Sequence, residues 1–237
     1  MESSKKFLEA VIRLSFHDRH IKDTDLAAIG ACPNLKELRL DDVKITDPGL
    51  EHFKRLTSLE VLSLNSTLVR GTGLIYLKKL TSLRVLDLGF TPITDDGLEP
   101  LQYLTNLKKL SLKRTSITDK GFKYLQYLTN LEELYLWDLP ITDDGLKYLQ
   151  NLTNLKELSL SGTSITDDGL KYLQNLTNLK ELCLSDTSIA GYGLEYLQNL
   201  TNLKELSLRE TSVTDEEARH FNNLLKKKGE KSCVVYR

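Results

Sequence analysis

Residues 155–178 read LKELSLSGTSITDDGLKYLQNLTN, and Leu179 begins the same pattern again. With this 24-residue period, nine units follow one another without insertion or deletion; they start at Val11, Leu35, Leu59, Leu83, Leu107, Leu131, Leu155, Leu179 and Leu203. A fixed period of this length is the signature of a solenoid, in which each unit buries its apolar face against its neighbours. Solenoids present extended surfaces, so we expect a binding protein and not a catalyst.

Each unit predicts a strand followed by a short helix. Residues 156–160 alternate polar and apolar side chains, which is the period of a half-buried strand. Leu170, Leu173 and Leu176 recur every three residues, and Asp167 ahead of them is a favourable N-cap for a helix. Strands pair about 4.8 Å apart, whereas packed helices need about 8–10 Å. We therefore expect a curved array with a parallel concave sheet and helices on the convex side.

The unit LxxLxLxxT followed by ITDxGLxxLxxL resembles the leucine-rich repeat family. It is most similar to the repeats of many bacterial proteins and to the cysteine-containing repeats of F-box adaptors. The resemblance covers residues 11–226 and implies an α/β fold, a right-handed horseshoe solenoid that binds proteins through its concave face. It also implies that the ninth residue of a unit bonds the backbone of adjoining loops, as expected of Thr67, Thr91, Thr115, Thr163, Thr187 and Thr211. Arg19, Val43 and Leu139 depart from this pattern.

The ends of the chain are predicted to cap the array. We expect an N-terminal cap over residues 1–10, nine repeats over residues 11–226, and a C-terminal cap over residues 227–237. Residues 216–228 predict a longer helix, acidic at its start and basic at its end, and residues 232–236 predict a last strand.

Three units carry irregular helix sequences. Units three and eight have Arg70-Gly71 and Ala190-Gly191 in place of the Thr-Asp pair, so their helices are predicted to start weakly. Pro100 lies inside the fourth helix and is predicted to make it irregular.

Composition and charge argue against several classes of function. A formal net charge of −1 gives no general electrostatic case for nucleic acid or an anionic membrane, and no run of 18 apolar residues spans a bilayer. Residues 1–6 lack an apolar signal segment. Cys32, Cys183 and Cys233 are far apart and lack CxxC spacing, which agrees with a reducing compartment. We expect an intracellular, cytoplasmic monomer; delivery into a host cell as an effector is the alternative.

The outward positions of the strands predict a binding site. Tyr135 and Trp137, the only tryptophan, interrupt a grid that serine mostly fills, and aromatic residues with arginine are typical of interface hot spots. An alternative is that Trp137 folds over Leu139 and Pro140 as local packing. The residues predicted to bind a protein partner are Tyr135, Trp137, Asp138, Phe90, Asp87, Lys113, Arg114, Glu133, Glu157, Arg39 and Asp41.

Glu133, Glu157, Glu181 and Glu205 occupy one position in four successive strands, and we call them the glutamate row. Like charges about 5 Å apart across strands repel. Two interpretations stay open. The neighbouring residues Lys156, Lys180 and Lys204 balance the row, or a basic partner does so.

The sequence offers little for catalysis. GxGxxG, P-loop, GxSxG and HExxH motifs are absent. His17 and His20 flank Asp18, but a metal site needs convergent side chains, and Cys183 has no histidine in neighbouring units to activate it. We therefore expect a non-enzymatic module without cofactor or metal. The alternatives are an effector or inhibitor that blocks an enzyme, a substrate receptor of a ubiquitin-ligase or signalling assembly, and an enzyme built on Cys183 or the two histidines.

Overall fold

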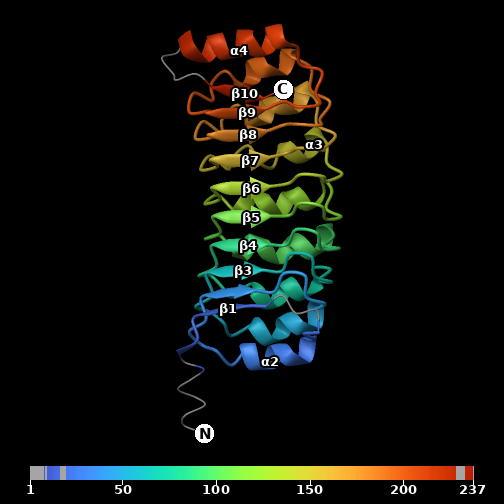
Figure 1. Ribbon diagram of the computed structural model, residues 1–237, viewed down its shortest axis with the longest axis vertical. Coiled ribbons are helices and arrows are strands. Elements are labelled where there is room, and N and C mark those ends of the chain that lie inside the picture. The colour runs from blue at the N-terminus through green and yellow to red at the C-terminus, as the bar shows by residue number, and fades with distance from the viewer. Residues whose placement is uncertain (1–7, 9, 17–19, 228–232, 237) are drawn as a thin grey trace. The chain divides into compact units, whose positions relative to one another are not determined.

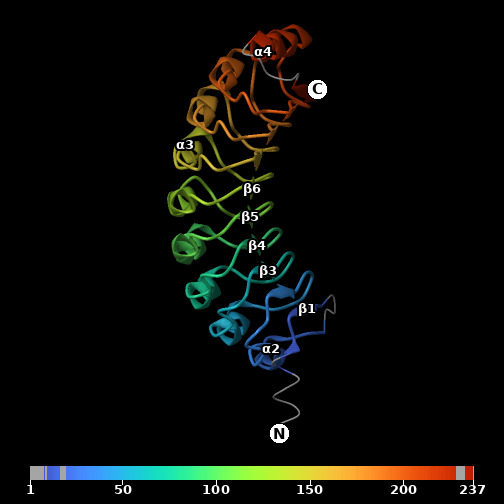
Figure 2. The ribbon, with the colours of Figure 1, turned by 90° about the vertical axis from the view of Figure 1, so that its left-hand side faces the viewer.

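Most repeats contribute a three-residue strand and a short helix (Figure 1). The computed structural model describes residues 8, 10–16, 20–227 and 233–236, and it divides into an N-terminal unit, residues 1–116, and a C-terminal unit, residues 117–237. In each unit the strands lie on one side, the strand face, and the helices lie on the other, the helix face (Figure 2). Among the described residues, no helix is long and apolar enough to cross a membrane.

The N-terminal unit contains five parallel strands that pair in chain order. They are β1 (Arg13–Ser15), β2 (Glu37–Arg39), β3 (Val61–Ser63), β4 (Val85–Asp87) and β5 (Lys109–Ser111). The helices, where η marks a 3-10 helix, are η1 (Asp23–Asp25), α2 (Leu26–Ile29), η2 (Asp47–Phe53), η3 (Thr72–Leu77) and η4 (Asp95–Tyr103).

The C-terminal unit repeats this arrangement. Its strands are β6 (Glu133–Tyr135), β7 (Glu157–Ser159), β8 (Glu181–Cys183), β9 (Glu205–Ser207) and β10 (Val234–Tyr236), again parallel and in chain order. Its helices are η5 (Gly121–Tyr127), α3 (Asp143–Leu146), η6 (Asp167–Leu173), η7 (Tyr192–Leu197) and α4 (Asp215–Lys227).

Leucines of the repeat fill the space between strands and helices. Leu155, Leu160, Leu170 and Leu173 of one repeat are all fully buried. Each buried leucine contributes about 1.5–3 kcal/mol by leaving water, and the same positions recur in neighbouring repeats. The core is therefore continuous within each unit.

Most of the short helices are 3-10 helices. This type has three residues per turn, which matches the three-residue spacing of Leu170, Leu173 and Leu176. The irregularity predicted at Pro100 is wrong, since η4 runs uninterrupted through it. In an α-helix, the ring of a proline clashes with the carbonyl group four residues earlier. A 3-10 helix bonds the carbonyl three residues earlier instead.

The aspartate of the Thr-Asp pair links one repeat to the next, so the predicted N-cap role of Asp167 is wrong. The N-cap of η6 is Thr166, whose hydroxyl accepts from the Asp168 amide at 3.3 Å. Asp143 of the preceding repeat accepts from the Thr166 amide at 2.9 Å and from its hydroxyl at 2.6 Å. Because the threonine caps the start of its own helix, the aspartate carboxylate that follows it in the sequence can bond the following repeat instead.

This link also corrects the prediction of weak starts in units three and eight. Gly71 and Gly191 provide no side-chain cap. The preceding repeat supplies the acceptors instead: Asp47 accepts from the amides of Arg70, Gly71 and Gly73 at 2.7–2.9 Å. In unit eight, Asp167 accepts from the amides of Ala190 and Gly193. The preceding repeat therefore satisfies several of the amide groups at the start of these helices.

The ninth residue of a unit forms a more local bond than the resemblance implies. The Thr163 hydroxyl donates to the Leu160 carbonyl at 2.6 Å, within its own unit, and the other five threonines at this position do the same. Val43 and Leu139 are buried at this position. Asparagine adds to the bonds that aspartate makes between repeats: the Asn154 side chain donates to the Thr129 carbonyl at 2.9 Å.

Candidate functional site

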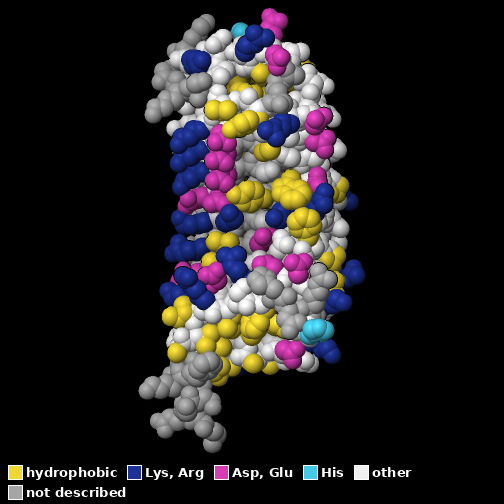
Figure 3. Space-filling view, in the orientation of Figure 1, with side chains coloured by type: hydrophobic (Ala, Val, Ile, Leu, Met, Phe, Trp, Pro, Cys, Tyr) yellow, Lys and Arg dark blue, Asp and Glu magenta, His cyan; other side chains and the backbone are white. Residues whose placement is uncertain are grey.

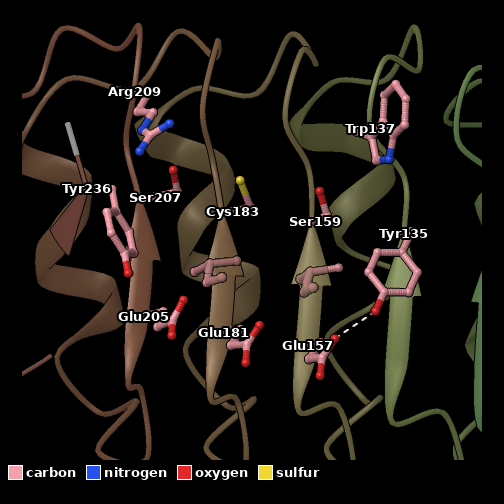
Figure 4. A pocket seen from close by; sticks show the side chains of 12 residues that line it. Tyr135, Trp137, Glu157, Ser159, Glu181, Cys183, Glu205, Ser207, Arg209 and Tyr236 are labelled. Atoms are coloured by element: carbon pink, nitrogen blue, oxygen red, sulfur yellow. Dashed lines mark hydrogen bonds between the residues drawn. The ribbon is translucent and has the colours of Figure 1, made fainter. Parts of the chain in front are cut away.

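A cavity of about 390 Å³ opens on the strand face of the C-terminal unit (Figure 4). Side chains of β6 to β10 and of the turns after β6 and β9 line it. Tyr135 and Trp137 lie at one end, and Arg209 and Tyr236 lie at the other. Trp137 is partly exposed there.

The glutamate row is continuous in this unit. Strand register places Glu133 beside Glu157, Glu157 beside Glu181, and Glu181 beside Glu205. The four carboxylates therefore lie at successive strand spacings of about 4.8 Å. Acidic side chains form a column over these strands, beside a column of basic ones (Figure 3).

Tyr135 is tied to two members of the row. Its hydroxyl lies 2.7 Å from Glu157 Oε2 and 2.9 Å from Glu133 Oε2, so it donates its proton to one carboxylate at a time. Burial raises the pKa of Tyr135, and the two carboxylates raise it further. The hydroxyl therefore stays protonated at neutral pH and holds the ring in place.

Within the described part of the chain, the lysines beside the row form no ion pair with the four glutamates of the row. Lys156 forms an ion pair with Glu132, which lies outside the row. Glu181 and Glu205 form no ion pair with any residue that the structure describes. The interpretation that neighbouring lysines neutralise the row is therefore not supported by contacts, although Lys204 weakly favours ionisation of Glu181.

A pH-dependent stability effect is expected from the row. Partial burial raises the pKa of Glu181, and the charges of Glu157, Glu205 and Glu133 add to this. The folded chain then binds this proton more tightly than the unfolded chain, so the carboxyl lowers stability as pH rises through its raised pKa. We expect Glu181→Gln to stabilise the protein by about 0.2–1 kcal/mol at pH 7.

Denaturant unfolding at several pH values checks this prediction. The gain should disappear below the ordinary glutamate pKa, where both folded and unfolded chains carry the proton. Glu195→Gln, at an exposed position of η7, is the control and should show no such gain. A stability gain of Glu181→Gln that grows toward acid pH would contradict the argument.

Cys183 lies on the cavity floor between serines. Its thiol lies 2.9 Å from the Ser161 hydroxyl, which donates to it, and 3.6 Å from the Ser185 hydroxyl. Burial raises the pKa of Cys183, but hydrogen bonds from Ser161, Ser185 and Ser207 outweigh burial, so its pKa is lowered overall. No histidine lines this cavity among the residues that the structure describes.

In the N-terminal unit the predicted residues fall into two groups. Lys113 Nζ and Arg114 Cζ lie 5.5 Å and 5.6 Å from the centre of the Phe90 ring, within the range of cation–π contacts. Phe90 is 39% exposed, so these three residues form an accessible patch.

The other three predicted residues of that unit are engaged locally. Arg39 pairs with Glu37 at 2.8 Å, and Asp41 accepts a hydrogen bond from Ser63. Asp87 accepts from the Gly89 amide at 2.9 Å. Their charges are therefore partly committed to neighbours on the strand face.

Phe90 occupies a backbone position that suits smaller residues. The eighth residue of eight successive units is left-handed, with φ of 56° at Phe90, 57° at Ser66 and 66° at Gly162. A bulky residue in this region is strained by roughly 1–2 kcal/mol, whereas asparagine and glycine adopt it readily. A large aromatic residue in such a backbone conformation indicates a functional role for its exposed side chain.

We expect Phe90→Asn to stabilise the protein by about 1 kcal/mol in denaturant unfolding, because strain is relieved and no core packing is lost. Asp42→Asn, at the same position of the second unit, is the control and should change stability by less than about 0.5 kcal/mol. Destabilisation by Phe90→Asn would instead mean that the ring packs as part of the fold.

The sequence missed one end of the cavity. The Arg209 guanidinium lies 5.6 Å from the Tyr236 ring centre, and neither residue belongs to the predicted set. Asp138, which does, is exposed beside the cavity. Among the described residues no group of three potential ligands is arranged to hold a metal ion. The predicted alternative at His17 and Asp18 lies outside those residues.

Comparisons with known proteins find relatives that cover most of the chain. Family models described as leucine-rich repeat match residues 33–93, 103–125 and 151–173. The crystal structure of internalin C2 from Listeria monocytogenes is 31% identical with a TM-score of 0.74, covering 89% of this chain and 84% of that chain. A second Listeria monocytogenes internalin, inlF, is 24% identical with a TM-score of 0.62, covering 89% and 69%, and shows likeness of fold. A search of curated proteins gives no significant match.

Proposed function

Because this chain belongs to the leucine-rich repeat family, we propose that it is a non-catalytic module that binds a protein partner on the strand face of its C-terminal unit. Proteins of this family generally mediate protein–protein interactions. The observation that carries the proposal is the open cavity with Tyr135 and Trp137 at one end. The proposed setting is the cytoplasm, which the three free cysteines favour.

The proposed mechanism is rigid presentation. Tyr135 stands on β6 and is fixed by its hydrogen bonds to glutamates, so little side-chain freedom is lost when a partner covers it. Trp137 offers a large apolar surface at the rim of the same cavity. Aromatic anchors of this kind contribute most of the affinity at interfaces. The patch of Phe90, Lys113 and Arg114 is proposed as a second contact on the N-terminal unit.

A pull-down from the native source, read by mass spectrometry, tests the proposal. We expect a partner that wild type retains and that Tyr135→Ala/Trp137→Ala loses, since loss of two anchors costs more than about 2 kcal/mol and hence over tenfold in affinity. Tyr103→Ala/Tyr127→Ala is the matched control, because these tyrosines are 53% and 50% exposed at the ends of η4 and η5. Equal recovery by wild type and the anchor variant would place the site elsewhere.

Further assays, together with the pull-down, separate the remaining alternatives. An enzyme among the partners that the isolated chain inhibits would favour an effector or inhibitor. A partner found only with an additional subunit would favour a receptor role in a ligase or signalling assembly. Turnover by the isolated chain that Cys183→Ala removes would overturn the non-catalytic proposal.

A further inference from the structure

A row of five side chains forms the floor of the cavity in the C-terminal unit. Strand register places Tyr135, Ser159, Cys183, Ser207 and Tyr236 side by side on β6 to β10. The three middle side chains are small and the two end ones are aromatic. The floor is therefore low in the middle and walled by a ring at each end (Figure 4). Across five strands it spans about 19 Å.

The glutamate row forms one long side of this floor. Glu157 already accepts from Tyr135, whereas Glu181 and Glu205 have no cation paired with them among the residues described. Their carboxylates repel one another, and burial and neighbouring charges raise the pKa of Glu181. A positive charge placed over the floor would relieve this repulsion, which an anionic or apolar segment would not do.

We propose that the occupant of this cavity is an extended, lysine- or arginine-rich segment of the protein partner, whose cationic side chains pair with Glu181 and Glu205. The proposal rests on the proposed function and names the chemistry of its partner. About six extended residues at roughly 3.3 Å each span the floor from Tyr135 to Tyr236. The stems of lysine and arginine are apolar and fit against the two tyrosine rings, while their charged ends reach the carboxylates.

Defined peptides test this inference without knowledge of the native partner. The probe is an acetylated and amidated peptide of alternating lysine and serine, six residues long, and its partner peptide replaces each lysine by glutamine. Trp137 is the only tryptophan of the chain and lines the cavity, so its fluorescence reports binding. We expect the lysine peptide to change this fluorescence saturably and the glutamine peptide to leave it unchanged.

Variants locate the binding site. Glu181→Gln/Glu205→Gln should weaken binding of the lysine peptide roughly three- to tenfold, because each exposed ion pair contributes modestly to affinity. Glu195→Gln/Glu216→Gln makes the same change of net charge on η7 and α4 and should leave the affinity within about twofold of wild type. Raising salt should weaken the wild-type complex more than the Glu181→Gln/Glu205→Gln complex. Equal binding by wild type and the Glu181→Gln/Glu205→Gln variant would overturn the inference.

Lengthening the peptide gives a second test. Affinity should rise up to about six residues, the length that spans the floor, and then level off. A steady rise with every added lysine would indicate diffuse attraction and count against the inference.

The native partner distinguishes failure of this inference from failure of the proposed function. A partner lost by Tyr135→Ala/Trp137→Ala but fully retained by Glu181→Gln/Glu205→Gln would sustain the proposed function and overturn the basic segment. A partner retained by both variants would overturn the proposed function and, with it, this inference for the native complex.

Discussion

Gly71→Ala is expected to destabilise the protein by about 3 kcal/mol or more, which is a large fraction of the stability of a natural domain. Gly71 has a φ of 112°, where L residues are strained. A methyl group there would also lie 2.5 Å from the Cα atom of Gly97 in the next repeat. The positive φ and the contact with Gly97 both involve backbone atoms, which cannot rotate away as a side chain can. The two repeats would therefore have to move apart to make room for the methyl group. Denaturant unfolding of the whole chain measures the loss.

Gly162→Ala is the matched control for this prediction. Gly162 also has a positive φ, of 66°, but Asp138 and Asp186 adopt 55° and 54° at the same place in their units. The added methyl group would clash with Asp138 Oδ1, the end of a side chain, whereas the nearest backbone atom, the Asp138 nitrogen, is 3.5 Å away. We expect a loss of no more than about 1–2 kcal/mol. A loss equal to that of Gly71→Ala would mean that φ alone decides the cost.

The repeat predicts the fold because a constant period fixes strand register. Leu158 lies 24 residues before Leu182 in the sequence, and the structure pairs the two in adjacent strands. The roles of the linking aspartates could not be predicted in this way. Asp143 precedes a helix in the sequence, but the partner of its carboxylate depends on where the turn of the next repeat places Thr166.

The site was predictable only where the period holds. Position in the unit places Glu157 beside Glu133 and therefore within reach of Tyr135. Tyr236 pairs with Ser207 in the last strand but does not follow it by 24 residues, because the long helix α4 intervenes. The aromatic wall at that end of the cavity had no signal in the repeat pattern.

Asp167→Ala is expected to destabilise the protein by about 3 kcal/mol. Asp167 is only 2% exposed, and its two carboxylate oxygens accept from the Ala190 amide at 2.9 Å and from the Gly193 amide at 2.7 Å. Removal leaves both amides without an acceptor, and each orphaned group costs about 1–3 kcal/mol. Unit eight cannot compensate, because Ala190 replaces the threonine that would otherwise help to cap this helix.

Two further variants separate this link from a general effect of charge. Asp168→Ala removes the neighbouring carboxylate, which is exposed, and should cost less than about 0.5 kcal/mol. Asp167→Asn keeps one acceptor oxygen but turns a donor toward the second amide, so its loss should fall between the other two. Amide exchange at Ala190 and Gly193 should quicken in the same order. Equal losses for Asp167→Ala and Asp168→Ala would show that the bonds between repeats add nothing to stability, and that leucine packing alone holds units seven and eight together.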